Sequence, residues 1–188
     1  MGDTRQVSEG LRLIYLGNMI TIITIVCTPV VALLSLGLLV GVLAAVVLMG
    51  SIVALVGLAR LRNEHPDYMK ALIALVVAMV AGVFAGNSSA FGMLMSIVKT
   101  VGTMVEVYFV VRATNSFLNA KWFREPAAMG DRAWKWQVIS LGVDAATVLV
   151  ILILPLLGIL MIVVNLVVSI AALVFYLIYL KTSAAVLA

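Results

Sequence analysis

Apolar residues dominate this chain in long runs, which short polar breaks or Gly- and Pro-containing breaks interrupt at regular intervals. A helix of about 20 apolar residues, rising about 1.5 Å per residue, is long enough to cross the hydrocarbon core of a membrane. The pattern predicts six such helices, at residues 11–34, 36–59, 70–86, 90–118, 133–154 and 158–180. We therefore expect an all-α, polytopic membrane protein in which residues 1–188 form a single six-helix transmembrane domain.

The breaks between the runs are of two kinds, and together they predict three helical hairpins in one bundle. Short breaks at 35–37, 86–89 and 155–158 are rich in Gly, Ser or Pro, which mark tight turns. Longer connections at 60–69 and 119–132 contain charged residues and are expected to be polar loops. Each short break would then join the two helices of one hairpin, and each loop would join consecutive hairpins.

The composition agrees with a membrane protein and argues against a soluble domain, a disulfide-bonded domain and a nucleic-acid-binding protein. Hydrophobic residues make up 65% of the chain, whereas soluble domains are closer to half apolar. The single cysteine, Cys27, excludes an internal disulfide framework and is expected to be a small buried hydrophobe. The net charge is +4, but the basic residues stand singly at helix ends and do not form a groove, so we do not expect nucleic acid as a partner.

The distribution of basic residues predicts the orientation in the bilayer. All of the twelve Lys and Arg residues except Lys99 lie at the amino terminus, in the two loops, at adjoining helix ends or near the carboxyl terminus. Positive residues mark the cytoplasmic side of a membrane protein, so both termini and both loops should be cytoplasmic. An aromatic belt at the inner interface would agree with this orientation, and it would comprise Trp122, Trp134, Trp136, Tyr68 and Tyr179.

The two loops run into the helices that follow them as RNEHPDYMKAL (62–72) and DRAWKWQVI (131–139). These two loop–helix junctions resemble those of six-helix bacterial membrane proteins that have no named function. The resemblance implies a multipass protein of the bacterial plasma (inner) membrane, and it implies no specific activity.

Polar side chains recur at helical spacing within the apolar runs and predict a polar interior. Residues three, four or seven positions apart share one face of a helix, and lipid cannot satisfy their hydrogen bonds, so these faces should turn inward. The first, fourth, fifth and sixth helices all carry such residues. The candidate intramembrane polar site comprises Lys99, Asp144, Glu106, Thr103, Asn165, Asn18, Ser140 and Thr147.

Three charged residues of this set suggest a mechanism. Counted from the helix ends at about 1.5 Å per residue, Lys99 and Asp144 both fall near the middle of the membrane. We therefore predict that they form a buried ion pair between the fourth and fifth helices. Glu106 should lie nearer the cytoplasmic interface, in contact with water or with a loop arginine. One lysine against two acids is an arrangement found in proton-coupled carriers; the alternative is a purely structural pair.

Small residues recur at intervals of four on the second and third helices, for example at Gly37 and Gly41 and at Ala74 and Ala78. This spacing lets helix backbones approach closely. It favours packing within the bundle, and the alternative is an interface in a homo-oligomer.

No motif for catalysis or for a cofactor is present. His65, the only histidine, has no second His or Cys nearby, so we do not expect a metal site; Pro66 and Asp67 more simply start the third helix. The chain contains no Gly-rich phosphate loop and no pair of a nucleophile with a histidine base. We expect a protein that is not an enzyme and has no cofactor.

Two classes of function fit these observations. The first is a transporter, or the solute-binding membrane subunit of a larger importer, which moves a small solute or a proton through the polar interior. The second is a membrane scaffold, or a regulatory or assembly subunit, which would bind a partner membrane subunit through the cytoplasmic loops or a small-residue helix face. Its marker is the segment 119–136, where aromatic and basic residues alternate. An oligomeric channel is a further alternative.

Overall fold

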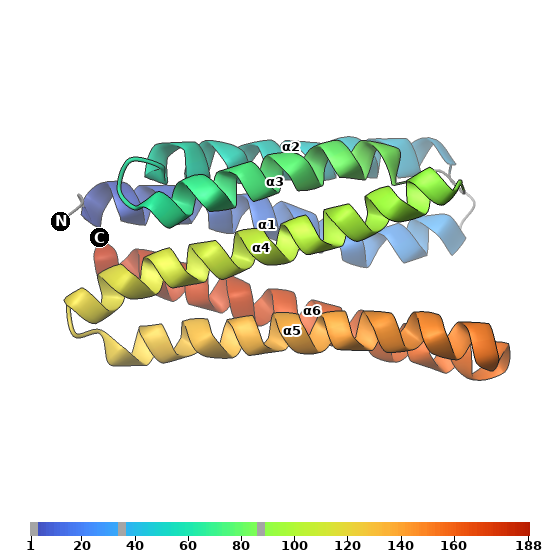
Figure 1. The fold of residues 1–188 in the computed structure, drawn as a ribbon. Coiled ribbons are helices and arrows are strands. Elements are labelled where there is room, and N and C mark those ends of the chain that lie inside the picture. Colours follow the sequence, from blue (N-terminus) through green and yellow to red (C-terminus); the bar gives the residue numbers. More distant parts are fainter. Residues whose placement is uncertain (1–3, 34–36, 86–88) are drawn as a thin grey trace.

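The computed structural model describes residues 4–33, 37–85 and 89–188, and the helices in these residues make the structure all-α (Figure 1). They are α1 (Thr4–Leu33), α2 (Gly37–Leu61), α3 (Pro66–Phe84), α4 (Ala90–Ala120), α5 (Arg124–Ile153) and α6 (Pro155–Leu187). The predicted all-α class is therefore confirmed. The predicted breaks at 35–37 and 86–89 fall largely outside the described residues.

The helices form a ring in chain order. The most extensive contacts are those of α1 with α2, of α3 with α4 and of α5 with α6. Smaller contacts join α2 to α3 and α4 to α5, and α6 returns to contact α1. The two termini, the α2–α3 loop and the α4–α5 turn all lie at one end of the bundle, on the left in Figure 1. We call this the terminal end, and the opposite end the far end.

The α2–α3 loop ends at a well-defined helix start. His65 has an extended backbone, and its Nδ1 atom accepts a hydrogen bond from the backbone N–H of Asp67 at 3.2 Å. Pro66 occupies the first position of α3, where its missing N–H is not needed. The carboxylate of Asp67 is buried and lies 2.7 Å from Lys70 Nζ and 3.3 Å from Arg112 Nε. The interpretation of Pro66 and Asp67 as a helix start is thus confirmed, and α3 begins four residues before the predicted boundary at Lys70.

The connection between α4 and α5 is much shorter than the expected loop at 119–132. α4 continues to Ala120 and α5 begins at Arg124. Trp122 has a φ of 63°, in the left-handed region that ends many helices, and the N–H of Phe123 donates to the carbonyl of Leu118 at 2.9 Å. This cap normally uses glycine, so the sequence gives no signal for the tight turn.

A core of buried apolar residues fills the half of the bundle nearer the terminal end. It is built by all the helices, and its fully buried members include Leu11, Ile14, Leu58, Leu61, Val110, Leu118, Leu180 and Leu187. Toward the far end large apolar side chains turn outward, so that Val83 is 73% exposed and Ile153 is 74% exposed. The bundle is therefore tightly packed in one half only.

The outer surface is that of a membrane protein. Within the described residues, α2, α3, α4 and α6 each contain a stretch long and apolar enough to cross a membrane. These helices carry many exposed Leu, Ile and Val side chains along their length, as expected for helices that face lipid. Cys27 lies on this exposed surface, so the expectation that it is buried is wrong.

α1 and α2 approach each other most closely at two pairs of glycines. A Cβ atom added to Gly17 would collide with the carbonyl oxygen of Gly50 and lie 2.8 Å from the backbone nitrogen of Ala54. A Cβ added to Gly57 would lie 2.8 Å from the carbonyl oxygen of Gly10. The two pairs are seven residues apart on both helices, so they lie on one face of each. Gly41, by contrast, faces open space.

Candidate functional site

Four of the eight predicted site residues come together where α4 meets α5. Lys99 and Thr103 are one turn apart on α4, and Ser140 and Asp144 are one turn apart on α5. All four line a cavity of about 180 Å³ that also includes Gln137. The helical spacing therefore predicted the correct faces of both helices. We call this space the α4–α5 cavity.

Asp144 does not pair with Lys99. No ion pair within 4.0 Å joins these two residues, both of which the structure describes. Instead Asn165 of α6 donates a hydrogen bond from Nδ2 to Oδ1 of Asp144 at 2.6 Å. The partner of the Asp144 carboxylate is thus a neutral amide on the adjacent helix. α5 packs much more extensively on α6 than on α4, which favours a partner from α6. The predicted buried ion pair is wrong.

The hydrogen bond between Asp144 and Asn165 is part of a small network that joins α5 to α6. The hydroxyls of Ser140 and Ser169 lie 3.1 Å apart, and Ser169 also donates to Oδ1 of Asn165 at 3.5 Å. The network fixes the position of the carboxylate at the edge of the α4–α5 cavity. The acidic wall of the cavity is therefore held in place by α6.

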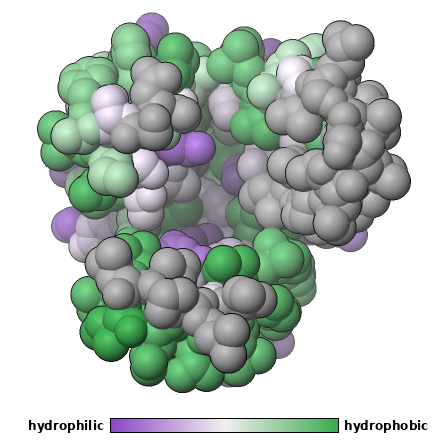
Figure 2. Space-filling view, turned by 90° about the vertical axis from the view of Figure 1, so that its right-hand side faces the viewer, coloured by the Kyte–Doolittle hydropathy of each residue, from purple (hydrophilic) through white to green (hydrophobic). Residues whose placement is uncertain are grey.

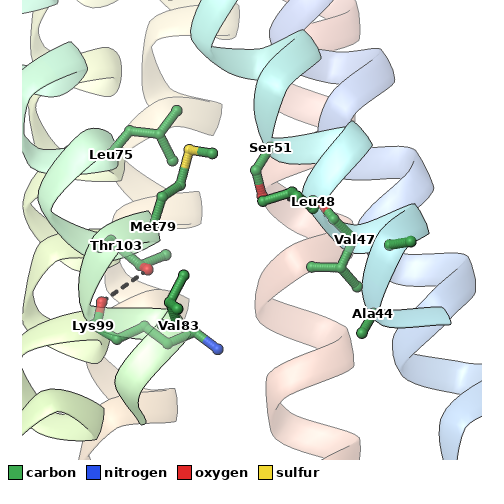
Figure 3. A pocket seen from close by; sticks show the side chains of 12 residues that line it. Ala44, Val47, Leu48, Ser51, Leu75, Met79, Val83, Lys99 and Thr103 are labelled. Atoms are coloured by element: carbon green, nitrogen blue, oxygen red, sulfur yellow. Dashed lines mark hydrogen bonds between the residues drawn. The ribbon is translucent and has the colours of Figure 1, made fainter. Parts of the chain in front are cut away.

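Lys99 extends away from α5. Its side chain passes close to Gly82, where an added Cβ would lie 3.5 Å from Lys99 Cδ, and its nitrogen is directed past Val83 into the space between α3 and α2 (Figure 3). This second cavity has a volume of about 570 Å³ and is lined by α2, α3 and α4. We call it the α2–α4 cavity. Lys99 and Thr103 line both cavities, so they lie at the boundary between them.

The cavities belong to a hollow at the far end of the bundle. Figure 2 looks onto that end and shows a central hollow in which hydrophilic residues (purple) are visible. The two cavities lie at the α2–α3 and α4–α5 contacts, which are among the smallest in the ring. Toward the terminal end the hollow stops at the buried core. The charged residues Lys99 and Asp144 thus line the cavities at the far end, and the packed core closes the bundle toward the terminal end.

Three other predicted residues, Thr147, Asn18 and Asn165, do not line either cavity. Thr147 is buried and donates to the carbonyl of Val143 at 2.7 Å, and Asn18 donates to the carbonyl of Ile14 at 2.9 Å. Neither contributes a polar atom to the two cavities. Asn165 contributes indirectly, by holding Asp144.

Glu106 occupies a place that the sequence did not predict. Its side chain is buried in the packed half of the bundle, with 4% of the residue exposed, and no hydrogen-bond donor reaches its Oε1 atom. In the described part of the chain no Lys, Arg or His nitrogen lies within 4.0 Å of it. The hydroxyl of Tyr176 on α6 is likewise buried without a hydrogen-bond partner among the described residues. The expectation of contact with water or a loop arginine is therefore wrong.

The sequence also missed the polar network that closes the terminal end. The hydroxyls of Tyr68 and Thr114 lie 2.9 Å apart and join α3 to α4. Tyr179 of α6 donates to Oδ1 of Asn115 at 2.9 Å, and Asn115 donates to Asp131 of α5 at 3.2 Å. Tyr68 and Tyr179 are fully buried, so their assignment to an interfacial aromatic belt is wrong. A tyrosine near a helix end fits either role, and the sequence does not distinguish them.

No known family model, curated protein or solved structure matches this chain. The function must therefore be argued from the site itself.

Proposed function

We propose that this protein is a small membrane transporter, either a carrier in its own right or the solute-binding subunit of a larger importer. In this proposal all the helices span the bacterial plasma membrane as three hairpins, and both termini are cytoplasmic. The hollow at the far end would then open to the outer side of the membrane, and the core at the terminal end would close the inner side.

The observation that supports this proposal is the asymmetry of the polar interior. Lys99, Thr103, Ser140 and Asp144 line cavities at the far end, whereas the half nearer the terminal end is filled by a buried apolar core that also encloses Glu106. Charged residues at membrane depth are costly and usually mark a pathway for a solute or ion. A cavity that reaches such residues from one side only is what a carrier requires in one of its two states.

A scaffold or assembly role has weaker support. The aromatic residues of 119–136 that could dock a partner are largely engaged within the chain. Trp134 packs against Tyr108 with ring centroids 5.1 Å apart, and Trp136 stacks on Phe175 at 5.3 Å. Trp122, at the turn, is the strongly exposed member of the set.

Transport can be tested with purified protein reconstituted in liposomes on a solid-supported membrane. Charge displacement is recorded as short monocarboxylates, α-amino acids and alkylamines are applied in turn. We expect a current for at least one class, reduced by Lys99→Met and by Asp144→Asn. Lys135→Met removes an exposed lysine that lines neither cavity and should leave the current unchanged. If no class gives more current than empty liposomes, or if all the variants behave alike, the proposal fails.

The predicted sidedness has its own test in intact cells. In a Cys27→Ser background, a single cysteine at Thr103, which is exposed and lines both cavities, should react with a membrane-impermeant maleimide added outside. A single cysteine at Lys121, in the turn at the terminal end, should react only in inverted vesicles. The reverse labelling pattern would contradict the proposed orientation.

A further inference from the structure

We propose that the α2–α4 cavity binds an amphipathic organic monoanion and that the Lys99 ammonium receives its carboxylate. This inference rests on the proposed function, since it names the class of solute for the same hollow. It depends on three features of the cavity: its size, its lining and the position of its single charge.

The size and lining of the cavity suit a small molecule with an apolar body. Ligand sites usually measure about 300–1,000 Å³ and are mainly apolar with a few polar groups, and this cavity measures about 570 Å³. Its walls are built largely by Ala, Val, Leu and Met side chains, including Val47, Leu48, Leu75, Met79 and Val83 (Figure 3). An alkyl chain or an aromatic ring would be buried against them.

Lys99 is the one group in this lining that can offer a free donor to a ligand. The only other polar side chains among the described lining residues are Ser51 and Thr103. Ser51 donates to the carbonyl of Val47 at 3.0 Å, and Thr103 donates to the carbonyl of Lys99 at 3.0 Å. Both hydroxyl protons are thus used within their own helices. The ammonium of Lys99 remains, and Figure 3 shows it directed into the cavity.

The ammonium of Lys99 forms no ion pair within the described residues, so it is free to receive an anion. Among the described residues no carboxylate lines the α2–α4 cavity, and Asp144, which shares the α4–α5 cavity with Lys99, is bound by Asn165 instead. An ammonium among apolar walls at membrane depth is costly unless it is paired. A bound carboxylate would supply the missing charge and accept a charge-assisted hydrogen bond.

The same reasoning selects a monoanion over other solutes. A zwitterion would place its own cation in a cavity that has no acid, and a dianion would leave one charge unpaired. An uncharged alcohol would leave Lys99 without a counterion. One charged head and an apolar body therefore match the lining best.

Binding can be measured without transport, by scintillation proximity with radiolabelled octanoate and protein in phosphatidylcholine nanodiscs. We expect unlabelled octanoate to compete and 1-octanol and octylammonium to compete poorly. Lys99→Met should weaken octanoate binding at least tenfold, because the carboxylate loses its charge-assisted hydrogen bond. Lys99→Arg should retain binding, and Lys135→Met is the matched control.

A second variant keeps the test decisive if Lys99→Met does not fold. Ala44 is exposed on the α2 wall, so Ala44→Phe should fill the cavity and abolish binding while Lys99 remains in place. Octanoate binding that survives both substitutions would overturn the inference. So would Lys99-dependent retention of phosphatidylglycerol without octanoate binding, because the cavity would then be a lipid site.

The outcome can be separated from that of the proposed function. Octanoate bound at Lys99 without a current in liposomes would support the inference and refute transport. A Lys99-dependent current for amino acids or amines, without octanoate binding, would support transport and overturn the inference.

Discussion

The close approach of α1 and α2 at Gly17 and Gly50 makes a sharp prediction about stability. A methyl group at Gly17 would meet the carbonyl oxygen of Gly50 and the backbone nitrogen of Ala54. Backbone atoms cannot rotate away as a side chain can, so the two helices would have to separate. We expect Gly17→Ala, and the reciprocal Gly50→Ala, to destabilise the protein.

The size of the effect follows from two opposing contributions. Overpacking costs about 1–3 kcal/mol, and a contact with rigid backbone belongs at the upper end of that range. Replacing a helical glycine by alanine gains about 0.5–1 kcal/mol. The net loss for Gly17→Ala should therefore be about 2 kcal/mol. Gly41 lies on the same helix pair but faces open space, so Gly41→Ala should only stabilise the protein, by about 0.5–1 kcal/mol.

The two variants can be compared by thermal unfolding in detergent, followed by circular dichroism. For a chain of this length each 1 kcal/mol shifts Tm by about 2–4 °C. A difference of about 2.5 kcal/mol between the variants therefore corresponds to about 5–10 °C, with Gly41→Ala the more stable. Equal melting temperatures for Gly17→Ala and Gly41→Ala would refute the close crossing.

Three further predictions concern other contacts. Trp122→Gly should raise the unfolding free energy by about 1 kcal/mol by relieving a left-handed backbone, and a lower Tm would contradict this. In double-mutant cycles the effects of Asp144→Leu and Asn165→Leu on the unfolding free energy should couple by about 1.5–3 kcal/mol, as for a hydrogen bond to a charged group. The effects of Lys99→Met and Asp144→Leu should be nearly additive, and strong coupling between them would contradict the observed pairing. Asn115→Ala should lower stability in detergent by about 1–2 kcal/mol through its lost hydrogen bonds; no change would show that the network at the terminal end is not formed.

The helices were largely predictable because their main signal is local. Long apolar runs and Gly or Pro breaks depend only on neighbouring residues, and they located most helix ends to within four residues. The exceptions are the end of α6, which continues to Leu187, the start of α1, which lies at Thr4, and the start of α5. There the charged residues that follow Arg124 suggested a loop, although they are compatible with the first turns of a helix. The turn at Trp122 lacks the glycine that would have marked it.

The candidate site was predictable in part for the same reason. Helical periodicity placed Lys99 with Thr103 and Ser140 with Asp144, because spacing along one helix fixes which residues share a face. The choice of partner depends instead on how adjacent helices are rotated and staggered, which a single sequence does not contain. Asn165 was in the predicted set, but nothing in the sequence ranks a neutral amide above Lys99 as the partner of Asp144.

The position of the core also has a mechanical consequence. Val110 lies in the core and Lys99 lies eleven residues away on the same helix, about 16 Å along its axis. If a helix pair tilted by about 10° about the core, Lys99 would move sideways by about 3 Å, as a lever of that length requires. Such a tilt would change the distance between helices at the far end, while the side chains of the core, which lie close to the pivot, would move much less.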